Sequence, residues 1–412
     1  MATKKKAPPP PPAKKAAKKP AAPTAAKGAA KEAADPPLTA AEKRVAAEKR
    51  ERAEKTLAKI NRMAKGTLAE VKKGHNPALS IPIRALSNVS FNEKKRLIEL
   101  GDKAQSREFF NKAMAKKFMQ TFLVAGAVKE LLDSAKTTSI RDLFYMTKHT
   151  IAGSRENTFD DQSESDPVIE DLEVGIDSLR EELHLFANPR GRVVGPLVIE
   201  DNGDEIDLAR LGSGGYAIPS IVEDYAVKFL RSDAEFVLLV EKFAVWARLN
   251  EDKYWRKAKC ILMTSEGQGA RGARRLLQRI ATELKLPVYV LVDNDPWGLY
   301  IYSVLKQGSI SLAYESMRLA LPNARYIGMS TFDYDKYGLG DSAKLVLEKD
   351  DISRAKQMLG YPWFAAKHWQ REINGMLEAG FKMEIEGLSA RGISFVTEEY
   401  IPKKLRDKDW LV

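Results

Sequence analysis

Three apolar runs alternate with helix-like segments between residues 235 and 298. The first, Phe236–Val240, contains five consecutive β-favouring residues and is followed at once by Glu241, a pattern typical of a buried parallel strand. The runs Cys260–Thr264 and 287–292 come next, each after a helix-like segment. The order strand, helix, strand, helix, strand predicts an α/β fold with a mainly parallel sheet, whose strands end at one common edge.

Three acidic residues follow the first and third of these strands, namely Glu241, Asp293 and Asp295. Carboxylates gathered at one sheet edge repel one another unless a cation neutralises them, and a site with only oxygen ligands favours Mg²⁺. The spacing also fits a second interpretation, in which strand-end aspartates cap the turn that follows. Glu266, in the glycine-rich turn SEGQGARGARR, is the alternative metal ligand. That turn lacks the GK[ST] ending of an ATP-binding P-loop.

The residues around these acids resemble those of a known protein family. An acid after a strand, in LLVEKFAVW, followed by DNDPWG, resembles the toprim fold of topoisomerases, primases and related nucleases. The longer stretches VEKFA and DNDPWGLYIYSVLKQGS resemble the A subunit of topoisomerase VI, a type IIB DNA topoisomerase, and its meiotic relative that makes double-strand breaks. The similarity runs from about residue 81 to about residue 410. It implies that Glu241, Asp293 and Asp295 bind Mg²⁺.

Upstream of this region, the chain predicts a DNA-binding module. Apolar residues recur with helical spacing from Ser106 to Leu132, and a polar break separates them from a second helix-like run at 140–149. Two helices joined by a short turn predict the core of a winged-helix (CAP-like) domain. Apolar segments within 183–208, joined by tight turns at PRG and DNGD, predict its wings. Arg190 and Arg192 at the first turn either contact DNA phosphate or form a solvated hairpin tip.

The second helix-like run contains RDLFY, residues 141–145, which resembles the family motif of an arginine and an acid followed by aromatic residues that end in tyrosine. The resemblance implies that Tyr145 is the nucleophile, although a tyrosine in an amphipathic helix is ordinarily a core or interface residue. Arg141 lies four residues earlier on the same helix face and can hold a phosphate beside the phenol. The family often has a basic residue in place of Ile140. Lys242, beside the first toprim acid, is either a further phosphate contact or a solvated side chain.

Positive charge is concentrated at the N-terminus. The net charge is +11, and residues 1–35 contain nine lysines against two acids, which gives +7 for this tail and leaves +4 for the rest. The Lys/Ala/Pro-rich tail, residues 1–38, cannot bury enough apolar surface to fold and is predicted to be disordered. Two roles fit its composition, namely sequence-independent DNA binding and a solubilising or targeting extension.

A helix is predicted after the tail, because Thr39 and Glu42 form a capping box before a run of helix-forming residues. Its apolar stripe, from Leu57 to Val71, either packs on its own domain or docks the B subunit that the resemblance implies. The glycine-rich segment 212–220 predicts a boundary before the toprim half. The expected domains are a tail (1–38), an N-terminal helical segment (39–80), a winged-helix domain (81–225) and a toprim domain with a C-terminal extension (226–412).

Cysteine content and hydropathy indicate the cellular compartment in which the protein is expected. A single cysteine excludes a disulfide framework and indicates a reducing environment. No apolar stretch approaches the roughly 20 residues that cross a bilayer, and no secretory signal is apparent, so the sequence predicts a soluble protein. The expected location is the cytoplasm, in association with the nucleoid, in a prokaryote, or the nucleus in a eukaryote.

The resemblance implies the DNA-cleaving and rejoining A subunit of an ATP-dependent type IIB topoisomerase. Tyr145 would attack a phosphodiester of double-stranded DNA and, in a homodimer, face the acids of the other protomer, so that two sites make a double-strand break. A B subunit with a GHKL ATPase would supply ATP hydrolysis in an A2B2 complex. Three alternatives stay open: a meiotic-type break-maker that does not reseal, a toprim nuclease or primase without covalent chemistry, and a non-catalytic DNA-architectural protein.

Overall fold

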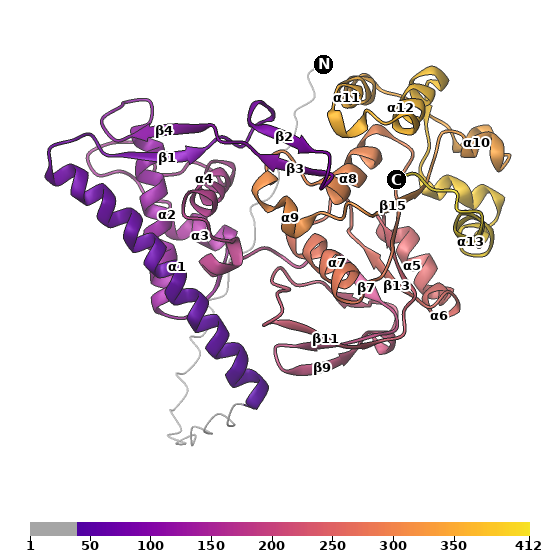
Figure 1. Cartoon of the computed structure of the whole chain (residues 1–412), viewed down its shortest axis with the longest axis horizontal. Coiled ribbons are helices and arrows are strands. Elements are labelled where there is room, and N and C mark those ends of the chain that lie inside the picture. The colour runs from indigo at the N-terminus through magenta and orange to yellow at the C-terminus, as the bar shows by residue number, and fades with distance from the viewer. Residues whose placement is uncertain (1–38) are drawn as a thin grey trace, which may run out of the picture. The chain divides into compact units, whose positions relative to one another are not determined.

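Six strands form the central sheet of the structure, a computed structural model that describes residues 39–412 (Figure 1). The predicted disordered tail, residues 1–38, lies outside the described residues. The strands are β7 (Arg192–Val194), β10 (Tyr216–Ala217), β12 (Phe236–Val240), β13 (Cys260–Thr264), β14 (Val288–Leu291) and β15 (Arg325–Gly328). Their order is β10-β7-β13-β12-β14-β15. Strands β12 to β15 are parallel to one another, and β7 runs antiparallel to both of its neighbours, β13 and β10. The predicted parallel α/β sheet is therefore confirmed.

The two faces of this sheet bury separate apolar cores. Side chains alternate along a strand, so Val237 and Leu239 face one core while Leu238 and Val240 face the other. The first core includes residues of α7 (Arg271–Glu283) and α8 (Pro296–Gln307), and the second includes residues of α5 (Phe243–Glu251) and α6 (Tyr254–Lys257). The chain continues with α9 (Ser316–Leu319), α10 (Asp333–Lys336), β16 (Leu345–Val346), α11 (Lys349–Leu359), α12 (Lys367–Ala379), β17 (Phe381–Lys382) and α13 (Ile401–Arg406).

The predicted pair of helices before the toprim sheet is present, but the first helix is shorter than predicted. This helix, α2, spans Ala115–Asp133, because residues 104–108 form strand β4 instead and pair antiparallel with β1 (Ala78–Pro82). The second helix, α3, spans Ile140–Thr147. The remaining elements of this half are β2 (Val89–Asn92), β3 (Leu97–Leu100), β5 (Thr138–Ser139), α4 (Gln162–Gly175) and β6 (Leu185–Phe186).

The N-terminal helix α1 spans Ala40–Lys72, and its predicted capping box between Thr39 and Glu42 is confirmed. The middle of its apolar stripe packs on its own domain, since Ile60 is buried in a core that it shares with Val124 of α2. Farther along the stripe, Leu68 and Val71 are each about half exposed. No helix formed by residues 39–412 combines the length and apolarity needed to cross a membrane.

The predicted wings form only in part. The turn at DNGD joins β8 (Leu197–Asp201) to β9 (Asp204–Asp207) in a hairpin, as predicted, and β11 (Val227–Ser232) completes a three-stranded sheet. The hairpin predicted at PRG does not form, because β7 pairs with β13 and β10 in the toprim sheet. The short strand β7 lies between β13 and the edge strand β10, and these distant hydrogen-bond partners are not indicated by the local sequence.

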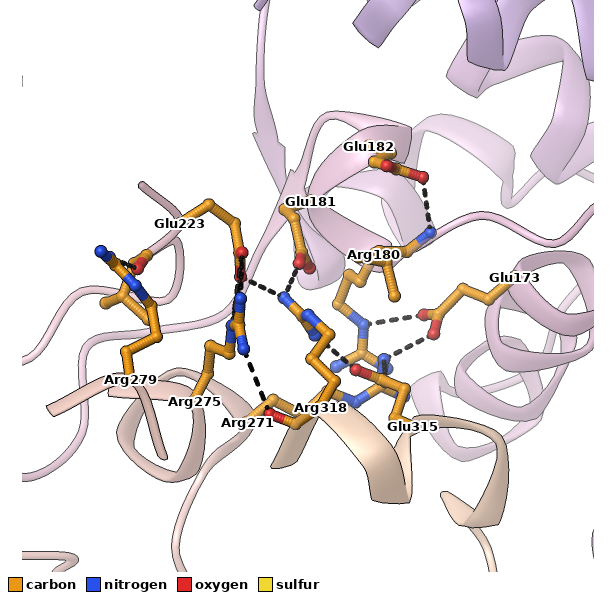
Figure 2. A network of polar contacts seen from close by, with 12 residues as sticks. Glu173, Arg180, Glu181, Glu182, Glu223, Arg271, Arg275, Arg279, Glu315 and Arg318 are labelled. Carbon is orange, nitrogen blue, oxygen red and sulfur yellow. Dashed lines mark hydrogen bonds and ion pairs between the residues drawn. The ribbon is translucent and has the colours of Figure 1, made fainter. Parts of the chain in front are cut away.

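A buried network of arginines and glutamates joins the tyrosine-bearing half to the toprim half (Figure 2). The carboxylate of Glu173, in α4, accepts bonds from Arg180 Nε (3.0 Å), Tyr314 Oη (2.7 Å) and Arg271 of α7. Burial opposes the charge of Glu173, but the guanidinium groups of Arg271 and Arg180 outweigh it and lower its pKa. Further ion pairs of the network involve Glu181, Glu223, Arg275, Glu315 and Arg318.

Candidate active site

Helix α3 presents Arg141 and Tyr145 to solvent. The helix begins at the cap residue Ser139, whose hydroxyl accepts a bond from Asp142 N (3.0 Å). Its opposite face is buried through residues such as Leu143, while the Tyr145 side chain is 59% exposed. Within residues 39–412, Arg141 forms no hydrogen bond or ion pair, so its guanidinium is available to an external anion. The exposed pair has the i, i+4 spacing that places both side chains on one helix face.

The acids predicted to share a sheet edge do so. Val240 of β12 is paired with Leu291 of β14, so Glu241 and Asp293 leave neighbouring parallel strands at their carboxyl ends. The backbone of Glu241 is fixed on both sides: its N–H donates to Leu291 O (3.0 Å), and its carbonyl accepts from Gly267 N (3.1 Å). These bonds fix the place where its side chain enters the site.

The two aspartates have further partners. Asp293 Oδ1 accepts from Ile385 N (2.9 Å), while Asp295 caps helix α8 by accepting from Gly298 N. The turn-capping interpretation therefore holds for Asp295. Capping engages only Oδ1 of Asp295, so this bond does not by itself exclude a second role for the residue.

The carboxylates disfavour one another's charge. Burial, followed by repulsion from Asp293 and Asp295, raises the pKa of Glu241 to about 7. Burial also raises the pKa of Asp293 to about 6, with a further rise from Asp295, against the lowering effects of Ile385 N–H and Lys242. The pKa of Asp295 is raised as well, again mainly by burial. A cluster of acids whose pKa values all rise has too little positive charge around it.

Lys242 supplies the nearest positive charge. Its Nζ lies 2.9 Å from Asp293 Oδ2, 3.1 Å from Glu384 Oε2 and 2.9 Å from Glu386 Oε2. Partial burial disfavours the ammonium, but its bonds to Glu386 and Asp293 outweigh that effect and raise its pKa. Lys242 is therefore neither a solvated side chain nor free for a phosphate in this conformation.

The donor set fits magnesium, although the described conformation does not hold the acids as a finished ligand shell. All the donors are carboxylate oxygens, and Glu241 Oε2 is buried without a hydrogen-bond partner among the residues that the structure describes. Across residues 39–412, no group of three or more His, Cys, Asp or Glu side chains is arranged as a metal ion requires. The ion pair between Lys242 and Asp293 is one reason that the acids are not arranged around a metal position, because the ammonium occupies a carboxylate oxygen that a metal would need.

Glu266 and the two arginines at the PRG turn lie beside this edge. Glu266 pairs with Arg192 Nε at 3.4 Å. Arg192 also donates to Gly214 O (3.1 Å), so it is committed to the protein. Arg190 is exposed and has no hydrogen bond or ion pair within the described part of the chain. Of the two arginines, only Arg190 is free to meet an anion.

Sequence reasoning missed the C-terminal contribution to the site. Glu384 and Glu386 reach Lys242, and Ile385 reaches Asp293, because residue Met383 forms a β-bridge with Asn294. The only local signal is the alternation KMEIEG, in which apolar Ile385 separates the two acids. That pattern indicates a half-buried strand and contains no information about the partner, which is about 90 residues away.

Three family models match successive parts of the chain. The model described as "Type IIB DNA topoisomerase" matches residues 116–185, and "All-beta domain in DNA topoisomerase VI alpha subunit" matches residues 190–233. The third model, which describes the toprim domain shared by topoisomerase 6 A subunits and Spo11, matches residues 236–405 and so includes the acidic edge.

Similar proteins are found in archaea and plants. The type 2 DNA topoisomerase 6 A subunit of Pyrococcus abyssi is 44% identical over 367 residues, which cover 86% of this chain and 94% of the relative. The protein of the same name from Hyperthermus butylicus is 43% identical over 378 residues, covering 87% of this chain and 96% of the relative. The DNA topoisomerase 6 A subunit of Arabidopsis thaliana is 36% identical over 340 residues, covering 82% of this chain and 77% of the relative.

Proposed function

The chain belongs to the family of topoisomerase VI A subunits, and on this premise we propose that Tyr145 is the nucleophile with which it cuts DNA. Its activity is that of the DNA-cleaving and rejoining A subunit of a type IIB topoisomerase. The observation that carries the assignment of Tyr145 is its exposure on the solvent-facing side of α3, beside Arg141, which has no hydrogen bond or ion pair in the described part of the chain. We further propose that it acts on chromosomal DNA, in a nucleoid or a nucleus.

The proposed reaction is a transesterification. The phenol oxygen of Tyr145 attacks a DNA phosphorus, a phosphotyrosyl bond forms, and the bond from phosphorus to one sugar oxygen breaks. The proton lost by the phenol is balanced by the proton that the leaving sugar oxygen takes up. Arg141 binds the phosphate and stabilises the charge that develops on it. Because the number of phosphoester bonds is unchanged, religation is the same step in reverse and needs no ATP.

We propose Glu241, Asp293 and Asp295 as the ligands of Mg²⁺. Glu266 is left out of this set because it lies in the turn after β13 rather than at the strand end, and it faces Arg192. The toprim domain generally binds Mg²⁺, and the buried Glu241 Oε2, which has no partner among residues 39–412, supports the same use here. When bound, Mg²⁺ supplies positive charge to the scissile phosphate and the leaving oxygen. For the acids to act as ligands, Lys242 has to release Asp293 and remain with Glu384 and Glu386.

We propose that two copies of the chain form the active unit, with Tyr145 of one protomer opposite the acids of the other. In the tyrosine-bearing half, Glu173 ties α4 to α7 through buried ion pairs, which oppose independent movement of α3 toward the acids of its own chain. No hydrogen bond or ion pair links Tyr145 to the toprim acids within residues 39–412. Two such sites cut both strands of a duplex.

A partner B subunit follows from membership of this family, and we propose where it docks. The end of α1 and the turn before α2 carry an exposed apolar surface, which includes Leu68, Val71 and Phe110, the last 71% exposed. A shallow groove of about 370 Å³ beside it is lined almost wholly by apolar side chains, among them Phe118 and Phe122. Such a patch suits a protein partner. We propose that the B subunit carries a GHKL ATPase and completes an A2B2 complex.

Replacing Tyr145 with phenylalanine tests the nucleophile. The change removes only the attacking oxygen from an exposed ring, so DNA binding should persist while covalent attachment to DNA is lost. The assay adds the B subunit with Mg²⁺, traps protein on DNA by denaturation and then maps the linked residue. Tyr216→Phe is the matched control, because Tyr216 is bonded to Asp201 (2.6 Å) and should not react. Wild-type adduct levels in Tyr145→Phe would move the search to other tyrosines.

A further inference from the structure

A cavity of about 320 Å³ lies where helix α7 begins. Its walls are the loop 268–270, the segment 218–220, the loop before β7 and the first turn of the helix. Gly272 allows the walls to approach closely, since a Cβ there would collide with the carbonyl oxygen of Pro219. The catalytic assignment above makes no use of this cavity or of the glycine-rich turn that borders it.

The backbone N–H groups at the start of α7 are free to donate hydrogen bonds to a bound ligand. The helix has 13 residues, and its cap residue, Ala270, has no side chain that could accept a bond from the first turn. In the described part of the chain, the N–H groups of residues 271–273 form no hydrogen bond. Free N–H groups at a helix start carry partial positive charge and bind anions.

Arg274 provides an independent sign of a missing anion. It lines the cavity, is only 3% exposed, and forms no ion pair with any described residue. Among residues 39–412, its side chain forms a single hydrogen bond, from Nη2 to Val304 O (3.1 Å), and its buried Nε has no partner. The other arginines of α7 behave differently, since Arg271 and Arg275 each pair with a glutamate (Figure 2). Arg279 pairs with Glu283 of its own helix. Glu315 favours the charge of Arg274 from a greater distance, without forming an ion pair with it. A buried guanidinium without a directly bonded carboxylate calls for another anion.

The remaining charges of the cavity leave it positive. Exposed Arg190 also lines it and approaches the loop, because its Nη2 would lie 3.8 Å from a Cβ placed on Gly267. The one acid in the lining, Glu181, is already bonded to Arg318. Two further arginines of the lining, Arg180 and Arg271, are held by Glu173.

We propose that this cavity binds a phosphate group, held by Arg274, Arg190 and the open N–H groups of α7. Gly267 N donates to Glu241 O, so the site adjoins the edge that carries the toprim acids. The phosphate therefore comes either from the backbone of DNA that reaches that edge or from a small free phosphate. The first source rests on the proposed function, whereas the second does not. The chemistry of recognition is the same in both.

The first experiment titrates inorganic phosphate into the full-length chain by calorimetry. Wild type should bind one phosphate per chain, and Arg190→Ala should weaken binding about tenfold, as expected for one charge-assisted contact. Arg210→Ala is the matched control, because Arg210 is exposed and faces Asp207 (3.4 Å) instead. Arg274→Gln should abolish binding. Since Arg274 is buried and this variant could unfold, a second variant is needed.

Ala270→Asp is that second variant. An aspartate at the cap position accepts bonds from the free N–H groups and sets a negative charge in the cavity. It should raise the melting temperature and at the same time lower the affinity for phosphate. A helix end with a purely structural role would show the rise in melting temperature alone. Unchanged phosphate binding in both Ala270→Asp and Arg190→Ala overturns a free-phosphate site.

A DNA arm separates the two sources. Binding of a short duplex is measured by fluorescence anisotropy at several salt concentrations. If the phosphate belongs to DNA, Arg190→Ala and Ala270→Asp should each reduce the salt slope by roughly 1. If it is a free phosphate, only the calorimetric affinity changes. No change in either measurement overturns the proposal. Adduct formation by Tyr145 is scored separately, so this site can fail while the proposed function stands.

Discussion

Replacing Glu241 with glutamine should stabilise the toprim half in the absence of divalent metal. Burial and the neighbouring aspartates raise the pKa of Glu241 from 4.5 to about 7. A folded-state pKa above the unfolded value means that folding retains a proton which the unfolded chain releases, so stability falls as pH rises from about 4.5 to about 7. At about 1.36 kcal/mol for each pKa unit, this rise sets an upper bound of roughly 3–4 kcal/mol on the gain at pH 8.

The measurement is urea unfolding with EDTA present, followed by tryptophan fluorescence. All six tryptophans lie between Trp246 and Trp410, so the signal reports the toprim half. The gain of Glu241→Gln should be complete at pH 8 and should vanish near pH 4.5, where both side chains are neutral. Glu266→Gln is the control: it removes a partly exposed ion pair with Arg192 and should lower stability by no more than about 1 kcal/mol.

The effect of Mg²⁺ on the stability of wild type and variant gives a second test of this site. Added Mg²⁺ should stabilise the wild type at pH 8 through preferential binding to the folded state, and it should stabilise Glu241→Gln much less. Two results would each refute the reasoning about this site. One is a Glu241→Gln variant no more stable than wild type at pH 8 in EDTA. The other is an equal response of variant and wild type to Mg²⁺.

Three further predictions address the other parts of the chain. Arg271→Met removes one ion-pair partner of the buried Glu173 and should lower the free energy of unfolding by about 3–5 kcal/mol, measured by urea titration. Adding Glu173→Gln to this variant should restore much of the lost stability. Deleting residues 1–35 should reduce the salt slope of DNA binding by up to about 0.9 per engaged lysine, measured by anisotropy, and an unchanged slope would assign the tail elsewhere. In a relaxation assay with supercoiled DNA and ATP, the chain alone should be inactive, and adding the B subunit should restore relaxation. Phe110→Asp should impair this restored activity. Val346→Asp, which changes a comparably exposed residue elsewhere, should leave it unchanged.

Local patterns in the sequence determined much of the scaffold. Five apolar residues before Glu241 specify a buried strand wherever they fold, and a capping box specifies the start of a helix at Thr39. The alternation of strands and helices requires parallel strands that end at one edge, which is why the convergence of Glu241 with Asp293 was predictable. The family motif singled out Tyr145, and helix periodicity put Arg141 on the same face.

Tertiary structure decided what these elements meet. Residues 106–108, predicted to be helical, instead belong to strand β4, because β1 offers backbone hydrogen bonds; β7 joined the toprim sheet for the same reason. The ammonium of Lys242 lies among Glu384 and Glu386, which are more than 140 residues away. Arg271 and Arg275 are paired because glutamates of other segments reach them, whereas no described glutamate forms an ion pair with Arg274. Periodicity and capping act over a few residues, whereas burial and ion pairing depend on segments brought together by the whole fold.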